Sequence, residues 1–163
     1  MSEADDRVAA AAAAAGLQIS IQRFPEGTRT AEDAARAVGC DVAQIVKSLV
    51  FVADGQPVIA LVSGADRLDP PRLAAALGAE RVDRADGDAV RAATGFAIGG
   101  VPPFGHARTL PVLMDRRLLE HEVVWAAAGR PDAVFSVAPE ALRRASGARL
   151  ADLAVHSPAR RAG

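Results

Sequence analysis

The segment QIVKSLVFVADGQPVIALVS, residues 44–63, constrains the fold of this chain more than any other part of the sequence. Two runs rich in β-branched and other apolar residues flank ADGQ, whose Asp-Gly pair tolerates the positive φ angles of a tight turn. Two such runs separated by such a turn predict a pair of antiparallel strands. We therefore expect a β-hairpin over this segment.

Helix signals lie on both sides of the hairpin. The N-terminal segment predicts a helix from about Glu3 to Ala15, which Gly16 ends. Thr30 and Asp33 form a capping pair for a second helix, and Gly39 follows the end of that helix. Three further helices, each opened by a capping aspartate or by proline in the first turn, are predicted at PPRLAAALG (70–78), GDAVRAATG (87–95) and PEALRRAS (139–146).

Short apolar runs predict the remaining strands, at LQISIQRF (17–24), ERVDRA (80–85), FAI (96–98), TLPVLMD (109–115), EVVWAAA (122–128) and AVFSV (133–137). These strands come in hairpins with helices inserted between them, and they do not alternate strictly with helices. This order predicts an α+β fold, in which helices surround a curled mixed sheet.

The size of the chain bounds its organisation. Its 163 residues suit one domain, which we expect at 17–155, with an N-terminal helix at 1–16 and a frayed tail at 156–163. The apolar runs are far shorter than the roughly 20 residues of a membrane-spanning helix, and the acidic N-terminus is unlike a secretory signal. We therefore expect a cytoplasmic protein without contact to a membrane.

Cysteine usage and charge exclude several classes of function. Cys40 is the only cysteine, which excludes an intramolecular disulfide and a zinc site built from cysteines. A formal net charge of −1 leaves no global basic field, so a nucleic acid would have to be bound through a local patch. The three histidines and the carboxylates show no pattern typical of a metal site, so we expect neither a metal nor another cofactor.

Lys47 is the only lysine among nineteen Lys and Arg residues, and it interrupts the apolar strand IVKSLVF. Burial of an unpaired ammonium group is costly, so its side chain either extends to the edge of the sheet or opens into a cleft with an anionic partner. An ammonium is a compact point charge, whereas a guanidinium is a rigid planar fork. Retention of one lysine in a chain otherwise full of arginine favours the cleft.

The segment FAIGGVPPFGHA, residues 96–107, is the second candidate for a functional site. Gly99 and Gly100 let main-chain N–H groups approach a ligand closely, and Pro102 and Pro103 fix the path of the chain. Such a loop suits an adenine, a phosphate or a carbonyl oxygen, but it is also typical of a rigid connection between strands. His106 after it is an acid–base group, a donor to phosphate or a packed polar residue.

Taken together, QIVKSLVF and GGVPPFGH resemble the YbaK and prolyl-tRNA-synthetase-associated family of trans-editing deacylases. The similarity runs from FPEGTRTAEDAARAVG to RLADLA, nearly the whole domain. It implies a barrel-like curled mixed sheet that holds the acceptor end of an aminoacylated tRNA. It also implies hydrolysis of the ester that joins a wrong amino acid to proline tRNA, without a metal or a protein nucleophile.

The resemblance also implies roles for particular residues. Lys47 matches the family lysine that positions the phosphate of the terminal adenosine and the ester. Gly99 and Gly100 begin the matching G-x-x-x-P loop, whose N–H groups orient or polarise the scissile carbonyl. The same resemblance implies a set of substrate-binding residues, with Phe104 to His106 supporting the loop and His106 not acting as a general base: Ser48, Val101, Pro102, Pro103, Phe104, Gly105, His106 and Gly129.

One segment departs from the family pattern. Cysteine-specific relatives have a serine in an SGG-like stretch, where this chain has Ala127 and Ala128 in WAAAGRP. We therefore expect removal of alanine or another small residue such as serine or threonine, more than of cysteine. The expected partners are the aminoacyl-tRNA acceptor end and prolyl-tRNA synthetase. The alternative is a noncatalytic module that binds an acceptor end or associates with a synthetase.

Overall fold

In this computed structural model we describe residues 3–24 and 30–156. An eight-stranded mixed sheet has the order β1-β8-β7-β2-β3-β6-β9, and β5 also pairs with β2. The two ends of this path, β1 and β9, do not pair with each other, so the curled sheet is not closed. The strands of the sheet are β1 (Ile21–Arg23), β2 (Ile45–Ala53), β3 (Gln56–Ser63), β5 (Val82–Arg84), β6 (Val112–Asp115), β7 (Val124–Ala127), β8 (Ala133–Val137) and β9 (Arg149–Ala151).

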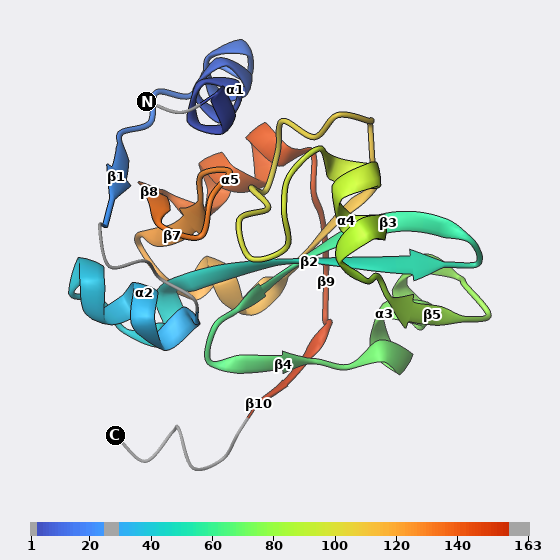
Figure 1. The fold of residues 1–163 in the computed structure, drawn as a ribbon. Coiled ribbons are helices and arrows are strands. Elements are labelled where there is room, and N and C mark those ends of the chain that lie inside the picture. Colours follow the sequence, from blue (N-terminus) through green and yellow to red (C-terminus); the bar gives the residue numbers. More distant parts are fainter. Residues whose placement is uncertain (1–2, 25–29, 157–163) are drawn as a thin grey trace.

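Five α-helices surround the sheet, which confirms the predicted α+β fold (Figure 1). They are α1 (Glu3–Ala14), α2 (Ala31–Val38), α3 (Pro70–Leu77), α4 (Gly87–Thr94) and α5 (Pro139–Ser146). Two short 3₁₀ helices, η1 (Val42–Gln44) and η2 (Arg116–Glu120), and a small sheet of β4 (Asp66–Leu68) and β10 (Ala154–His156) complete the described elements. No helix among the described residues has the length and apolarity needed to cross a membrane.

Local signals in the sequence account for several of these elements. The predicted hairpin is β2 and β3, joined at Asp54 (φ 47°) and Gly55 (φ 83°), as a two-residue turn with positive φ angles requires. The capping pair at the start of α2 is confirmed, because the Thr30 side chain accepts from the Asp33 N–H and the Asp33 side chain accepts from the Thr30 N–H. Gly39 ends α2 in the left-handed conformation.

Other predictions about strands were wrong. Residues 96–98 form no strand, because the Thr94 hydroxyl accepts from the Phe96 N–H and the chain turns so that Gly100 N–H donates to the Ala97 carbonyl. In the predicted strand 17–24, only Ile21–Arg23 pairs, with β8. The sequence reasoning also missed β4, β9 and β10, each three residues long. Strands this short depend on their partner more than on their own residues.

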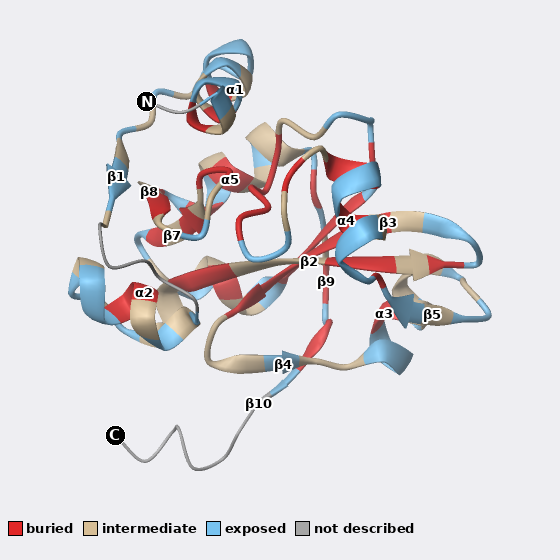
Figure 2. Ribbon diagram, in the orientation of Figure 1, coloured by how far each residue is buried: buried red, intermediate tan, exposed pale blue. Residues whose placement is uncertain are grey.

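The two faces of β2 pack against two different parts of the core. Val46 and Val50 belong to the larger apolar cluster, together with Phe104 and Phe135. Phe51, on the other face, packs in a second cluster with residues of α3 and the C-terminal segment. Figure 2 shows buried residues along β2 and β3 and exposed residues on the outer turns of α1 and α2. The central hairpin therefore separates two apolar layers.

The helix α1 contributes residues to the apolar core. Its residues Val8 and Ala12 are fully buried in the larger cluster. The Arg7 guanidinium lies 4.2 Å from the centre of the Phe96 ring and donates to the Gly95 carbonyl at 2.7 Å. α1 thus holds the beginning of the loop that follows α4. At the other end of the chain, β10 extends to His156, and the rest of the predicted tail lies outside the described residues.

Candidate functional site

The sheet has a gap along one edge of β2. This edge pairs with β7 at Ile45 and Val46, and with β5 from Phe51 to Ala53. No strand pairs with this edge at residues 47–50, and a cavity of about 330 Å³ lies at this gap. The separation of β7 from β5 along a single central strand therefore creates a site inside the fold.

The cavity has mostly apolar walls, which come from residues between Thr30 and Val134. Val46, Val50, Val90, Val101 and Val134 are among the lining residues, and Ile98, which is 54% exposed, lies on the loop at its rim. The lining residues with polar or charged side chains are Thr30, Lys47, Ser48 and Arg84. The remaining lining residues are Ala31, Ala34, Ile45, Leu49, Ala85, Gly99, Trp125, Ala126, Ala127 and Pro131.

Lys47 is held by the strand β4. Its Nζ donates to the main-chain carbonyl of Asp66 at 2.6 Å. The Asp66 carboxylate is only 8% exposed and lies 3.4 Å from the Arg117 guanidinium. The sequence did not predict the bond between Lys47 and Asp66, since a contact to a main-chain carbonyl leaves no signal in the residue type.

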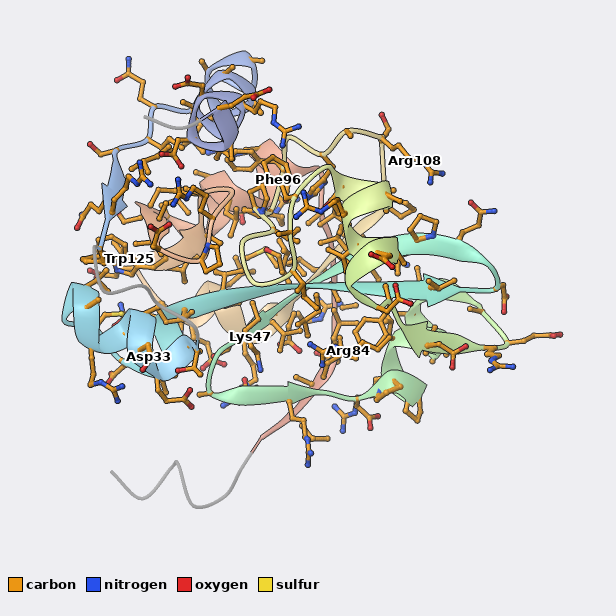
Figure 3. All side chains as sticks on the ribbon, in the orientation of Figure 1. Asp33, Lys47, Arg84, Phe96, Arg108 and Trp125 are labelled. Atoms are coloured by element: carbon orange, nitrogen blue, oxygen red, sulfur yellow. The ribbon has the colours of Figure 1, made fainter. Side chains whose placement is uncertain are left out.

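A second hollow lies on the Lys47 side of β2. This groove, with a volume of about 510 Å³, is lined by Lys47, Leu49, Phe51, Arg67, Leu68, Pro70, Val82, Asp83 and Arg84. Lys47, Leu49 and Arg84 line both the cavity and the groove, so the two are adjacent. In Figure 3, Lys47 and Arg84 both lie below β2. Arg67 and Arg84 have no ion pair within the described part of the chain.

The glycines of the loop serve two different purposes. Gly99, with φ of 90°, lines the cavity. A Cβ atom on Gly100 would lie 2.7 to 2.9 Å from the main chain of Arg130, so only glycine allows this close approach of loop and turn. The Gly100 N–H is already bonded to the Ala97 carbonyl, and proline has no N–H. The loop residues at the cavity are Ile98, Gly99 and Val101, and their N–H groups have no acceptor within the described residues.

The second half of the loop lies behind the cavity wall. Pro102, Pro103 and Phe104 are buried, and the Phe104 ring centre is 5.6 Å from that of Phe135. His106 donates from Nε2 to the Pro102 carbonyl at 2.7 Å, because a carbonyl oxygen can only accept. Burial lowers the pKa of His106, and the bond to Pro102 partly opposes this effect. These residues support the loop and do not line the cavity.

Two more glycines on the predicted list pack against α1. A Cβ atom on Gly105 would lie 2.9 Å from the Cβ of Ala11. Gly129 has φ of 97°, and a Cβ atom there would lie 3.1 Å from the Phe96 ring. The structure thus brings four of the predicted residues to the cavity, namely Lys47, Ser48, Gly99 and Val101. The others, Gly100, Pro102, Pro103, Phe104, Gly105, His106 and Gly129, do not line it.

Several lining residues were not predicted as part of a site. Thr30 was expected only as a helix cap, and Trp125 only as a strand residue, yet both line the cavity beside α2. Arg84 carried no signal among the many arginines of the chain. In the segment WAAAGRP, which differs from the family pattern, Ala127 lines the cavity and Ala128 is buried in the core. No group of three or more His, Cys, Asp or Glu within residues 3–24 and 30–156 is placed to hold a metal ion.

Two known proteins are similar to parts of this chain. The proline–tRNA ligase of Citrifermentans bemidjiense is 38% identical over 92 residues, which are 56% of this chain and 16% of that enzyme. The chain thus spans about one-sixth of the length of such ligases. A candidate Cys-tRNA(Pro)/Cys-tRNA(Cys) deacylase of Enterococcus faecalis is 28% identical over 131 residues, 80% of each chain.

A solved structure gives a closer match over the whole fold. The crystal structure of a candidate trans-editing enzyme for prolyl-tRNA synthetase has a TM-score of 0.90 and 44% identity, over 95% of this chain and 99% of that one. The family model described as "Aminoacyl-tRNA editing domain" matches residues 25–145, well over half of the sequence. The chain therefore belongs to the aminoacyl-tRNA editing domain family.

Proposed function

We propose that this chain is a trans-editing deacylase, which hydrolyses the ester between a small amino acid and the 3′ end of a mischarged tRNA, with proline tRNA as the principal substrate. The observation that carries this proposal is that Lys47, Gly99 and Val101 line one apolar cavity, and that the N–H groups of Gly99 and Val101 have no acceptor within the described residues. The names of the related proteins support it, since they concern prolyl-tRNA synthetase and deacylation.

An aminoacyl ester needs little chemical help, because it is already activated. A water oxygen bonds to the ester carbonyl carbon, and negative charge develops on the carbonyl oxygen. The bond to the ribose oxygen then breaks, and the proton released by the water ends on that oxygen, with the neighbouring ribose hydroxyl as relay. Main-chain N–H groups directed at the developing oxyanion, as at Gly99 and Val101, are worth about 10²- to 10³-fold each in rate.

His106 is not the base in this mechanism. Its ring lies behind the loop, donates from Nε2 to the Pro102 carbonyl and does not line the cavity. Burial lowers the pKa of His106, which disfavours the protonated ring. The proposed role of His106 is to support the loop that carries Gly99 and Val101.

The walls of the cavity favour a small amino acid. Its volume of about 330 Å³ is at the lower end for ligand sites and has to hold part of the nucleotide as well as the aminoacyl group. Valine and alanine make up half of the lining residues, and Ala127 adds no hydroxyl where cysteine-specific relatives have serine. We propose alanine as the first substrate, with serine and threonine next and cysteine last.

The groove beside the cavity is the proposed path of the acceptor strand. With the ester in the cavity, the phosphate of the terminal nucleotide approaches Lys47, and the strand continues toward Arg84 and Arg67 in the groove. Most other arginines in the described residues are engaged in ion pairs, whereas these two are not. A local patch of this kind suits a chain with a formal net charge of −1.

The test is a deacylation assay with the full chain and proline tRNA charged in turn with Ala, Ser, Thr, Cys and Pro. We expect release of Ala well above the uncatalysed rate and no release of Pro. Saturable tRNA binding without hydrolysis of any ester would contradict the enzyme and favour the noncatalytic module. Partnership with prolyl-tRNA synthetase is a separate proposal, checked by whether the purified synthetase binds the chain and raises its deacylation rate.

A further inference from the structure

One residue of β2 has main-chain groups that meet no strand. The Val50 carbonyl accepts from the Ala85 N–H at 3.1 Å, so even-numbered residues direct their polar groups toward the β5 edge. The Ile45 carbonyl accepts from the Gly64 N–H at 2.7 Å, so odd-numbered residues direct theirs toward β3. Because this direction alternates along a strand, the N–H and the C=O of Ser48 both point into the gap.

Neither neighbour of β2 reaches Ser48. β7 pairs only as far as Val46, and β5 begins to pair at Phe51. The Ser48 Oγ is also buried and has no hydrogen-bond partner within the described residues. Buried polar groups without partners are rare in native proteins, because their lost hydrogen bonds to water are not replaced. Ser48 thus offers a donor and an acceptor of the main chain, and a hydroxyl, at the cavity.

We propose that the aminoacyl group docks on this edge as a single residue of β-strand. Its α-ammonium group donates to the Ser48 carbonyl, and its ester carbonyl accepts from the Ser48 N–H. An aminoacyl ester has an ammonium donor on one side of its Cα atom and a carbonyl acceptor on the other. A residue in an antiparallel strand uses the same two groups, its N–H and its C=O, to form two hydrogen bonds with the residue opposite. This inference rests on the proposed function, since it describes how the same cavity holds its substrate.

The docking mode predicts where the substrate side chain lies. Directly opposed residues of an antiparallel pair place their side chains on the same face of the sheet. The amino acid side chain would therefore lie on the face of Ser48, Val46 and Val50, against the apolar cavity wall. The antiparallel direction leaves the ester oxygen toward the Lys47 end of the strand, where the proposed phosphate contact begins.

The same pairing adds a donor to the oxyanion site. The Ser48 N–H lies on the β2 side of the cavity, and Gly99 lies on the loop that forms another wall. A carbonyl oxygen that accepts from both the Ser48 N–H and the Gly99 N–H is held from two directions. Such an arrangement of donors stabilises a developing negative charge. The α-ammonium contact would also make the site selective for amino acid esters over other acyl esters.

Amide hydrogen exchange tests this docking mode directly. The probe is 3′-alanylamido-3′-deoxyadenosine, in which an amide replaces the ester and resists hydrolysis. At saturation we expect exchange of the Ser48 N–H to slow at least about tenfold, while the Leu49 N–H, which faces β3, is unaffected. The matched probe 3′-propionylamido-3′-deoxyadenosine lacks the α-amino group, and we expect it to bind about tenfold more weakly or worse.

The outcomes separate this inference from the proposed function. Saturable binding that shifts the Gly99 resonance and leaves Ser48 exchange unchanged would overturn the docking mode alone. Equal affinity of the two probes would do the same. Failure of the alanylamido probe to bind would contradict the proposed function as well. Protection of Ser48 in a protein that hydrolyses no ester would support the docking mode and contradict the deacylase.

A variant adds a kinetic test. Ser48→Pro removes the N–H donor, and proline is tolerated at strand edges where the N–H has no partner. We expect kcat for alanyl-tRNA to fall about 10²- to 10³-fold, with a cooperative thermal transition retained. Undiminished kcat in this variant would overturn the inference, and if the variant does not fold, the exchange experiment decides.

Discussion

The ammonium group of Lys47 lies 2.6 Å from the main-chain carbonyl oxygen of Asp66, on the strand that follows the central hairpin. Lys47 is the only lysine of the chain, and this bond holds its ammonium group where the cavity adjoins the groove. The carbonyl itself is held in place because the Asp66 carboxylate is nearly buried beside Arg117. The ammonium group that we propose to contact a phosphate thus has a defined position in the structure without a ligand.

Removal of the Lys47 charge should abolish most of the activity and leave the fold intact. Hydrogen bonds to charged groups contribute about 1.5–3 kcal/mol, so Lys47→Met should lower kcat/KM for alanyl-tRNA about 10- to 100-fold. Methionine keeps the apolar stem, and thermal unfolding checks that the protein still folds. Lys47→Arg should also lose activity, since a planar guanidinium cannot replace an ammonium bound to the Asp66 carbonyl. Full activity in Lys47→Met would remove this residue from the mechanism.

Gly100 should tolerate no side chain. A Cβ atom there would lie 2.7 to 2.9 Å from the Arg130 main chain, so Gly100→Ala must push the loop away from the 129–132 turn. We expect a loss of about 1–3 kcal/mol in the free energy of unfolding, together with lower deacylation, because Gly99 and Val101 move with the loop. The matched control is Gly87→Ala, where nothing lies within 4 Å of the added Cβ. Equal stability of the two variants in urea unfolding would contradict this prediction.

The stability of the protein should fall as the pH drops below the ordinary pKa of histidine. Burial lowers the pKa of His106 in the folded state, so the unfolded chain binds more protons between that value and about 6.5. The free energy of unfolding therefore rises with pH through this window and levels off above it. His106→Gln should reduce this slope, which urea unfolding at about pH 5.5 and about pH 8 would measure. An identical slope in the variant would show that other groups cause the pH dependence.

Arg67 and Arg84, the two arginines that line the groove, should control the salt dependence of tRNA binding. If Arg84 and Arg67 contact phosphates of the single-stranded acceptor end, Arg84→Gln and Arg67→Gln should each reduce the slope of log K against log salt by about 0.7. Arg108→Gln is the control, since Arg108 is exposed and lines neither hollow (Figure 3). Slopes that match the control in both variants would place the acceptor strand elsewhere.

The sequence by itself determined the elements that local chemistry specifies. Asp54-Gly55 encodes the hairpin turn, Thr30 with Asp33 encodes the start of α2, and both follow from dihedral preferences and short-range hydrogen bonds. Lys47 and the glycine-proline loop were recognisable as a pair because unusual residue types mark them. Signals of this kind need no knowledge of distant parts of the chain.

Only the tertiary structure decided how these parts form a site. The gap beside Ser48 exists because β7 and β5 end at different points along β2, and the Lys47 partner is a carbonyl of β4. Main-chain N–H and C=O groups occur at almost every residue, so contacts made through them leave no trace in the sequence. Gly100 also looked like a ligand-binding glycine, whereas its small size is required by the main chain of Arg130. Long-range packing, rather than residue type, determines which main-chain groups remain open to a ligand.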